Sequence, residues 1–68
     1  MQIKIKVNGK VKTFKENINL SKLVKNLKIP IKKVAIELNQ EIIDKKKVNK
    51  IKLKQNDKIE IVHFIGGG

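Results

Sequence analysis

One helical stripe of apolar residues lies between segments in which apolar residues alternate, and this pattern constrains the fold more than any other feature. The flanking segments, such as residues 3–7 and 34–38, show the two-residue period of half-buried strands. A single helix in a series of short strands has to cover one face of a mixed sheet, because both elements must bury their apolar side. The sequence therefore predicts an α+β roll. The stripe itself stands at i, i+3, i+4 and i+7 and consists of Leu20, Leu23, Val24 and Leu27.

The N-terminal segment is predicted to form a β-hairpin. Residues 3–7 are the first strand, residues 11–15 the second, and Asn8-Gly9 between them is a strong hairpin signal, because both residues tolerate positive φ. Two registers remain open at this point, since the loop can have two or three residues. The first would place Phe14 beside Ile3, and the second would pair Val7 with Val11.

The predicted helix has recognisable signals at both ends. Asn19 is a candidate N-cap, because its side chain can accept a hydrogen bond from an early helix amide. Pro30 is expected to stop the helix shortly after Leu27. The helix is then two to three turns long.

The second half of the chain is predicted to consist of short strands joined by polar turns. Residues 34–38 form a third strand, Asn39-Gln40 turns the chain, and Ile42-Ile43 is a short return. The Lys-rich residues 44–50 are expected to be a surface connection with up to one helical turn. The remaining predictions are an apolar sheet edge at Ile51 and Leu53, a turn at residues 55–57 and a last strand over residues 58–65.

Length and composition limit what the chain can do. With 68 residues, we expect one domain over residues 1–68 with a thin stability margin and no room for a deep catalytic cleft. There is no cysteine for a disulfide framework. The N-terminus does not look like a signal peptide, and no apolar run has the length of a membrane span. We therefore expect a cytoplasmic protein with no membrane partner.

The net charge of +11 comes entirely from lysine, since all 17 basic residues are Lys. A/T-rich codons explain such a composition, and a polyanionic partner is the functional alternative. Nucleic-acid binders normally add arginine for bidentate contacts and aromatic residues for stacking. This chain has no Arg, Trp or Tyr, which argues against a nucleic-acid site. The charge still predicts a preference for acidic protein surfaces.

Residues for internal catalysis or metal binding are scarce. There is one His and no Cys, so a His cluster for a metal and a thiolate ligand or nucleophile are both missing. Ser21 is the only serine and has no His near it in sequence. No glycine-rich loop precedes the helix, so a phosphate-binding motif is missing too. We therefore expect no bound cofactor, no metal and no internal active site.

The last predicted strand changes its pattern before the chain ends. Ile59 and Ile61 can face the core, whereas Val62 and Phe64 then face the other way. Outward apolar residues on a small basic domain indicate coverage by another protein, although a loop or the twist of the sheet could also cover them. His63 has the parity of Ile61 and is either a partly buried strand residue or a partner contact. The predicted docking residues are Val62, His63, Phe64 and Ile65.

Three glycines, Gly66, Gly67 and Gly68, follow this strand directly. Glycine lacks Cβ and ranges widely in φ and ψ, so such a tail can enter a narrow enzyme channel and present a bare carboxylate. The alternatives are a frayed terminus and a cloning remnant. The position of the glycines favours a functional C-terminus on a flexible tail.

The element order, the length and the C-terminal residues 62–68 resemble the ThiS family of sulfur carriers in thiamine biosynthesis. The resemblance covers the whole chain, and residues 34–43 and 56–62 are also similar to the family's corresponding segments. A glycine pair directly after the last strand is shared by ThiS, the molybdopterin-synthase subunit MoaD and ubiquitin. The resemblance implies a β-grasp, ubiquitin-like roll with a four- to five-stranded mixed sheet and one main helix across it.

The resemblance also implies a mechanism centred on the carboxylate of Gly68. A ThiF-like enzyme would adenylate it with ATP and Mg²⁺, and a sulfur donor such as a cysteine desulfurase would displace AMP to leave a thiocarboxylate. Gly66 and Gly67 would thread the partner's active site. The thiazole synthase ThiG would then receive the sulfur. The chain would be a protein co-substrate and not an enzyme.

Other readings remain open from the sequence alone. They are a MoaD-like carrier, a lysine-conjugated ubiquitin-like modifier, a small basic nucleic-acid-binding module and an enzyme. MoaD tails typically carry prolines before the glycines, whereas this chain has Phe64-Ile65 at that place. Members of the ThiS family are often acidic, whereas this chain is basic, so the family's charged partner contacts are not transferred to it. The partner contacts that the family makes with the segment at residues 45–54 are not transferred either.

Overall fold

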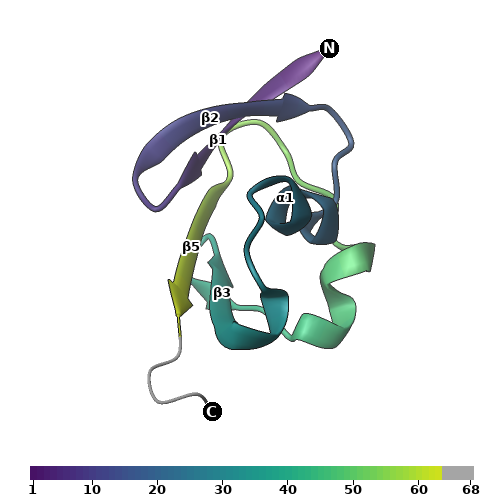
Figure 1. Ribbon diagram of the computed structural model, residues 1–68. Coiled ribbons are helices and arrows are strands. Elements are labelled where there is room, and N and C mark those ends of the chain that lie inside the picture. Colours follow the sequence, from purple (N-terminus) through teal and green to yellow (C-terminus); the bar gives the residue numbers. More distant parts are fainter. Residues whose placement is uncertain (64–68) are drawn as a thin grey trace.

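The computed structural model describes residues 1–63, which form a five-stranded sheet with one α-helix across one face (Figure 1). The N-terminal hairpin is followed by the helix, and the remaining strands come after it in the chain. In chain order the elements are β1 (Gln2–Val7), β2 (Lys10–Lys15), α1 (Leu20–Asn26), the 3₁₀ helix η1 (Ile31–Lys33), β3 (Val34–Leu38), β4 (Glu41–Ile42), the 3₁₀ helix η2 (Lys45–Lys50) and β5 (Lys58–His63).

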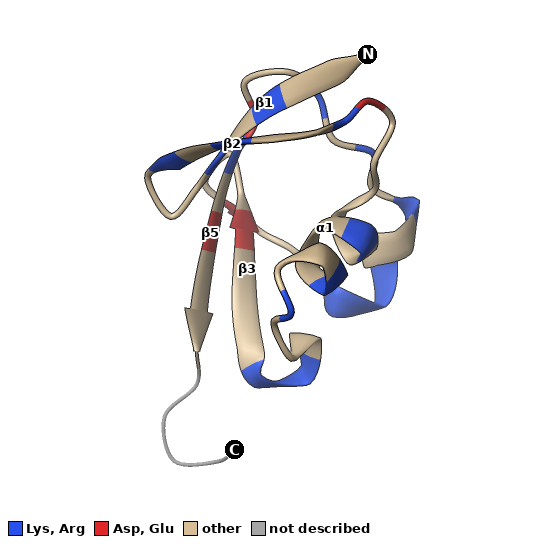
Figure 2. Cartoon of the chain, turned by 45° about the horizontal axis from the view of Figure 1, so that its top comes forward, with Lys and Arg blue, Asp and Glu red and all other residues tan. Residues whose placement is uncertain are grey.

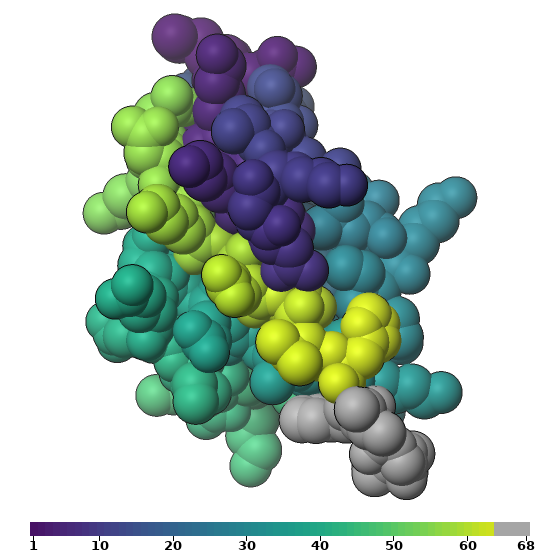
Figure 3. Space-filling view, turned by 90° about the vertical axis from the view of Figure 1, so that its left-hand side faces the viewer, coloured from purple at the N-terminus to yellow at the C-terminus, as the bar shows by residue number. Residues whose placement is uncertain are grey.

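The sheet is mixed, and the last strand lies at its centre. The strand order is β2-β1-β5-β3-β4, with β5 parallel to β1 and antiparallel to β3 (Figure 2). The hairpin strands β1 and β2 are antiparallel, as are β3 and β4. This is the β-grasp arrangement, so the predicted fold class is confirmed. Figure 3 shows the uncovered face, where β5 runs between β1 and β3.

The hairpin has the shorter of the two possible loops. Val7 pairs with Lys10 and Ile3 with Phe14, so only Asn8 and Gly9 lie between the strands. Their φ angles are 50° and 82°. Two-residue hairpin loops of this kind favour positive φ at both positions, because that conformation matches the twist of the strands.

The helix begins as predicted but ends by a different device. Asn19 accepts a hydrogen bond from the amide of Lys22 at 2.8 Å, which confirms it as the N-cap. The helix ends at Asn26, before Pro30. Lys28 has φ 58°, its amide donates to the Lys25 carbonyl at 2.9 Å, and the Ile29 amide donates to the Val24 carbonyl at 3.2 Å. These two bonds form a Schellman motif, which normally has glycine at the position of Lys28.

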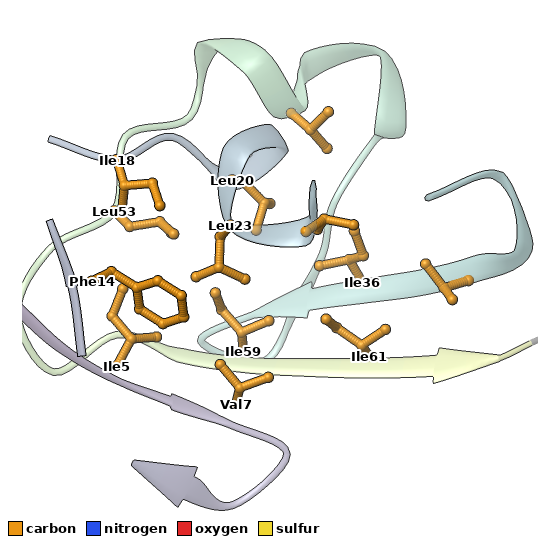
Figure 4. Packing of buried hydrophobic residues seen from close by; sticks show 13 residues of the cluster. Ile5, Val7, Phe14, Ile18, Leu20, Leu23, Ile36, Leu53, Ile59 and Ile61 are labelled. Atoms are coloured by element: carbon orange, nitrogen blue, oxygen red, sulfur yellow. The ribbon is translucent and has the colours of Figure 1, made fainter. Parts of the chain in front are cut away.

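The hydrophobic core lies between α1 and the inner face of the sheet (Figure 4). Three of the predicted stripe residues, Leu20, Leu23 and Val24, are at most 1% exposed, and Leu27 packs at the edge of the core. All buried residues within positions 1–63 are hydrophobic. They are Ile5, Val7, Phe14, Ile18, Leu20, Leu23, Val24, Val34, Ile36, Val48, Leu53, Ile59 and Ile61.

The predicted sheet edge at Ile51 and Leu53 is wrong. The edge beyond β3 is the short strand β4 instead. The Ile51 carbonyl accepts from the Leu20 amide, and the Leu53 amide donates to the Ile18 carbonyl, each at 2.9 Å. This segment therefore lies against the residues that lead into the helix. Leu53 is buried there, because its side chain packs into the core and does not lie at an edge of the sheet.

Candidate functional site

The central strand β5 carries the first of the predicted docking residues. Ile59 and Ile61 are 1% and 6% exposed and point into the core, as predicted. Val62 pairs with Ala35 of β3 on the uncovered face and is 59% exposed. The predicted change of face along this strand is therefore confirmed for Val62.

His63 differs from one of its two predicted roles. It pairs with Val34 at the end of β5 and has an exposed side chain, although it has the same parity as the buried Ile61. The interpretation of His63 as a partly buried strand residue is therefore wrong. Val34 opposite it is 0% exposed, so burial on the inner face reaches the start of β3 but not the His63 side chain at the end of β5. The role of His63 as a partner contact stays a prediction.

The rest of the predicted site lies outside the described residues. This applies to the docking residues Phe64 and Ile65, to the tail glycines Gly66 and Gly67, and to the carboxylate of Gly68. Their roles stay predictions. What the structure does establish is how the strand that leads to them is held.

Asn8 holds the end of β5 with its side chain. Its amide nitrogen donates to the Ile61 carbonyl at 3.2 Å, and its Oδ1 accepts from the Ile61 amide at 2.7 Å. The Asn8 backbone amide also donates to the Ile59 carbonyl at 2.9 Å. The side chain thus continues the parallel β1–β5 pairing past the last residue of β1. Sequence reasoning gave Asn8 only its turn role, and no local signal indicates the second one.

The start of β5 is held in a similar way by Asn39 and Asp57. The side-chain oxygen Oδ1 of Asn39 accepts a hydrogen bond from the Lys58 backbone amide at 2.9 Å. The Asn39 backbone amide donates to the Lys58 carbonyl at 2.8 Å. Asp57 accepts from the Asn39 side chain at 3.1 Å and from the Lys54 amide at 2.8 Å. Both ends of β5 are therefore held by hydrogen bonds with asparagine side chains.

The described part of the chain offers little for internal chemistry. Within residues 1–63 no group of three His, Cys, Asp or Glu side chains is arranged to hold a metal ion. Asp57 and Asp44 are engaged in turns, the latter as the cap of η2, where it accepts from the Lys46 amide at 2.9 Å. The same region contains no buried polar or charged residue. Over this range no helix is long and apolar enough to cross a bilayer.

The fold defines a small ubiquitin-like β-grasp protein, and in the sequence three glycines follow two residues after the last residue of the central strand. The profile of the ThiS family matches residues 5–68. This chain belongs to the ThiS family. A ThiS crystal structure from Geobacter metallireducens superimposes with a TM-score of 0.85 and is 32% identical, over 97% of this chain and 100% of that one.

Two further relatives have curated names. The sulfur carrier protein ThiS of Bacillus subtilis is 40% identical over 65 residues, which are 94% of this chain and 98% of the relative. A thiazole synthase of Paramagnetospirillum magneticum is 36% identical over 66 residues. The chain spans 20% of the length of that synthase, so the similar region is one part of a longer protein.

Proposed function

We propose that this protein is a sulfur carrier of thiamine biosynthesis that works through the carboxylate of Gly68. The observation that carries the proposal is the match to the Bacillus subtilis sulfur carrier over 98% of its length. The three C-terminal glycines of the sequence supply the bare terminus that such a carrier needs. The protein is then a co-substrate, and catalysis belongs to its partners.

The chemistry follows from the weakness of a carboxylate as an electrophile. A ThiF-like enzyme joins the Gly68 carboxylate to the α-phosphate of ATP, with Mg²⁺ on the enzyme and pyrophosphate as the leaving group. The persulfide of a donor of the cysteine desulfurase type then attacks the acyl carbon and displaces AMP. A thiol cleaves the resulting acyl disulfide, forms a disulfide with the donor's cysteine and releases the thiocarboxylate. The resulting thiocarboxylate is ionised at neutral pH, and an ionised sulfur is nucleophilic. A cytoplasmic location, where ATP is available, fits this cycle.

The acceptor of the sulfur is the thiazole synthase ThiG. Thiazole synthases from Paramagnetospirillum magneticum and Magnetococcus marinus each contain a region similar to this chain, over 20% of their length. A carrier-like region within a synthase chain favours thiazole formation over the transfer of sulfur to a pterin. The part played by the fold is to present the tail, since β5, which is held at Ile61 by Asn8, is the last described element before the glycines in the sequence.

Intact-mass spectrometry tests the proposal. The protein is incubated with ATP, Mg²⁺, a ThiF-type enzyme and a sulfur donor, and the Bacillus subtilis carrier serves as the positive control in the same reaction. We expect one terminal oxygen to be replaced by sulfur in the wild type. A variant lacking Gly68 should stay unmodified while its circular dichroism spectrum is unchanged. An unmodified wild type beside a converted control would contradict the proposal.

A further inference from the structure

The β1–β2 turn contains the one asparagine of this chain that a glycine follows, Asn8 before Gly9. This neighbour matters because the backbone nitrogen that follows an asparagine can attack its side-chain carbon, and a bulky next residue hinders the attack. Gly9 has no side chain, and a Cβ added to it would meet no atom within 4 Å. Asn8 therefore has the least hindered path to deamidation. The residues after the other asparagines are Ile18, Leu20, Leu27, Gln40, Lys50 and Asp57.

The reaction at this turn needs only water as a co-reactant. The Gly9 nitrogen bonds to the side-chain carbonyl carbon of Asn8, loses its proton and expels the side-chain nitrogen as ammonia, which closes a succinimide ring. Water then opens the ring at one of its two carbonyl carbons. Opening at the side-chain carbonyl gives aspartate. Opening at the backbone carbonyl gives isoaspartate, in which the main chain runs through the former side chain.

The folded sheet holds the Asn8 side chain in contacts that oppose this attack. Its Oδ1 accepts from the Ile61 amide at 2.7 Å, and its Nδ2 donates to the Ile61 carbonyl at 3.2 Å. Both edges of the carboxamide are thus bound to β5, and Figure 1 shows the β1–β2 turn beside that strand. The side chain has to leave Ile61 before its carbon can meet the Gly9 nitrogen. The reaction therefore requires a local opening between the turn and β5.

Neither product can restore both hydrogen bonds to Ile61. An aspartate side chain has no N–H, so the Ile61 carbonyl loses its donor and faces a carboxylate oxygen. Isoaspartate also lengthens the main chain of a two-residue loop by one methylene group, which no longer suits the pairing of Val7 with Lys10. Ammonia is lost from the site, so the original side chain does not form again. The conversion therefore leaves the end of β5 weakly held.

The geometry points to Asn8 as a spontaneous modification site whose reaction is controlled by the end of β5. While β5 is in place, the carboxamide is protected by Ile61. Each opening exposes it, and the conversion then makes the opened state permanent. Its rate is the rate in an unfolded chain multiplied by the fraction of molecules in which β5 has opened. This inference is independent of the proposed function, since it concerns only the turn and the strand.

Peptide mapping by mass spectrometry tests this control. The whole 68-residue chain is kept in warm, mildly alkaline buffer, and digests taken over weeks are separated into the asparagine, aspartate and isoaspartate forms of the turn peptide. A synthetic peptide of residues 3–13 gives the rate without the fold. Hydrogen exchange of the Ile61 amide gives its protection in the same buffer. We expect Asn8 to convert at least about tenfold more slowly in the protein than in the peptide, by a factor close to the protection of Ile61.

The substitution Asn39→Gly gives a second measurement, because it loosens the start of β5 and leaves Asn8 and Gly9 unchanged. It keeps a residue that accepts φ 51° and removes the side-chain bonds at that end of the strand. Conversion of Asn8 and exchange of Ile61 should both become faster. Lys25→Ala, at an exposed position on α1, is the control and should keep both wild-type rates. Wild type in urea below its unfolding transition serves the same purpose if Asn39→Gly does not fold.

Two results would overturn the inference. One is conversion of Asn8 in the folded wild type as fast as in the peptide. The other is a conversion rate that stays constant while the exchange of Ile61 becomes faster, in Asn39→Gly or in urea. The product is tested by thermal unfolding of aged protein enriched in the modified form, which should melt lower than fresh protein and protect Ile61 less. An unchanged melt would show that β5 closes around the product, against the proposed permanent opening.

Discussion

Replacing Asn8 by glycine should loosen the end of β5 and destabilise the whole domain. The substitution keeps a residue that accepts φ 50° and removes the two side-chain hydrogen bonds to Ile61. Each bond contributes about 0.5–1.5 kcal/mol net, and its loss leaves a partly buried backbone group without its partner. The greater freedom of glycine in the unfolded chain adds less than about 1 kcal/mol. We expect a loss of about 2–3 kcal/mol in the free energy of unfolding.

This loss is large for a domain of 68 residues, whose total stability is about 3–10 kcal/mol. Circular dichroism during urea and thermal unfolding is the suitable assay, because the chain has no Trp or Tyr for fluorescence. Each kcal/mol lowers the Tm of a domain of this size by about 4–8 °C. Asn8→Ala should cost about 1–2 kcal/mol more, since alanine resists positive φ.

Hydrogen exchange locates the effect within the molecule. The Ile61 amide donates to Asn8 Oδ1, so its protection should fall further than that of the Leu23 amide, which bonds within α1. Full stability of Asn8→Gly, together with unchanged protection of Ile61, would refute the claim that this side chain holds the last strand.

Two further substitutions test the ends of the helix. Asn19→Ala should lower the free energy of unfolding by about 1 kcal/mol, because the Lys22 amide loses its acceptor; Asn19→Asp keeps that oxygen and should be close to wild type in the same melts. Lys28→Gly should stabilise the protein by about 0.5–1 kcal/mol, because glycine relieves the cost of φ 58° at the end of the helix. Lys28→Ala keeps a Cβ and should bring no such gain. A Tm of Lys28→Gly at or below that of wild type would contradict this account.

Local patterns were sufficient for most of the elements and for the family. The two-residue and helical periods of the apolar residues predicted β1, α1, β3 and β5, because periodicity reflects which face each element buries. Asn19 was identifiable as the N-cap because capping acts over three residues. The glycine terminus, read directly from the chain, indicated the class of function.

The tertiary structure decided everything that depends on contacts between distant segments. The hairpin register, the place of Leu53 beside Ile18 and the bond between Asn8 and Ile61 each join residues whose partners no local period specifies. The exposure of His63 opposite the buried Val34 was likewise not specified by the alternation along the strand.

The pairing of Glu37 with Glu60 is a further case. In the sequence Glu37 and Glu60 are two carboxylates among many lysines, and only the pairing of β3 with β5 brings them together. A sequence by itself fixes the properties of residues that are neighbours along the chain. Which unlike or like charges become neighbours in space depends on strand order and register, and these are set by the packing of the complete core.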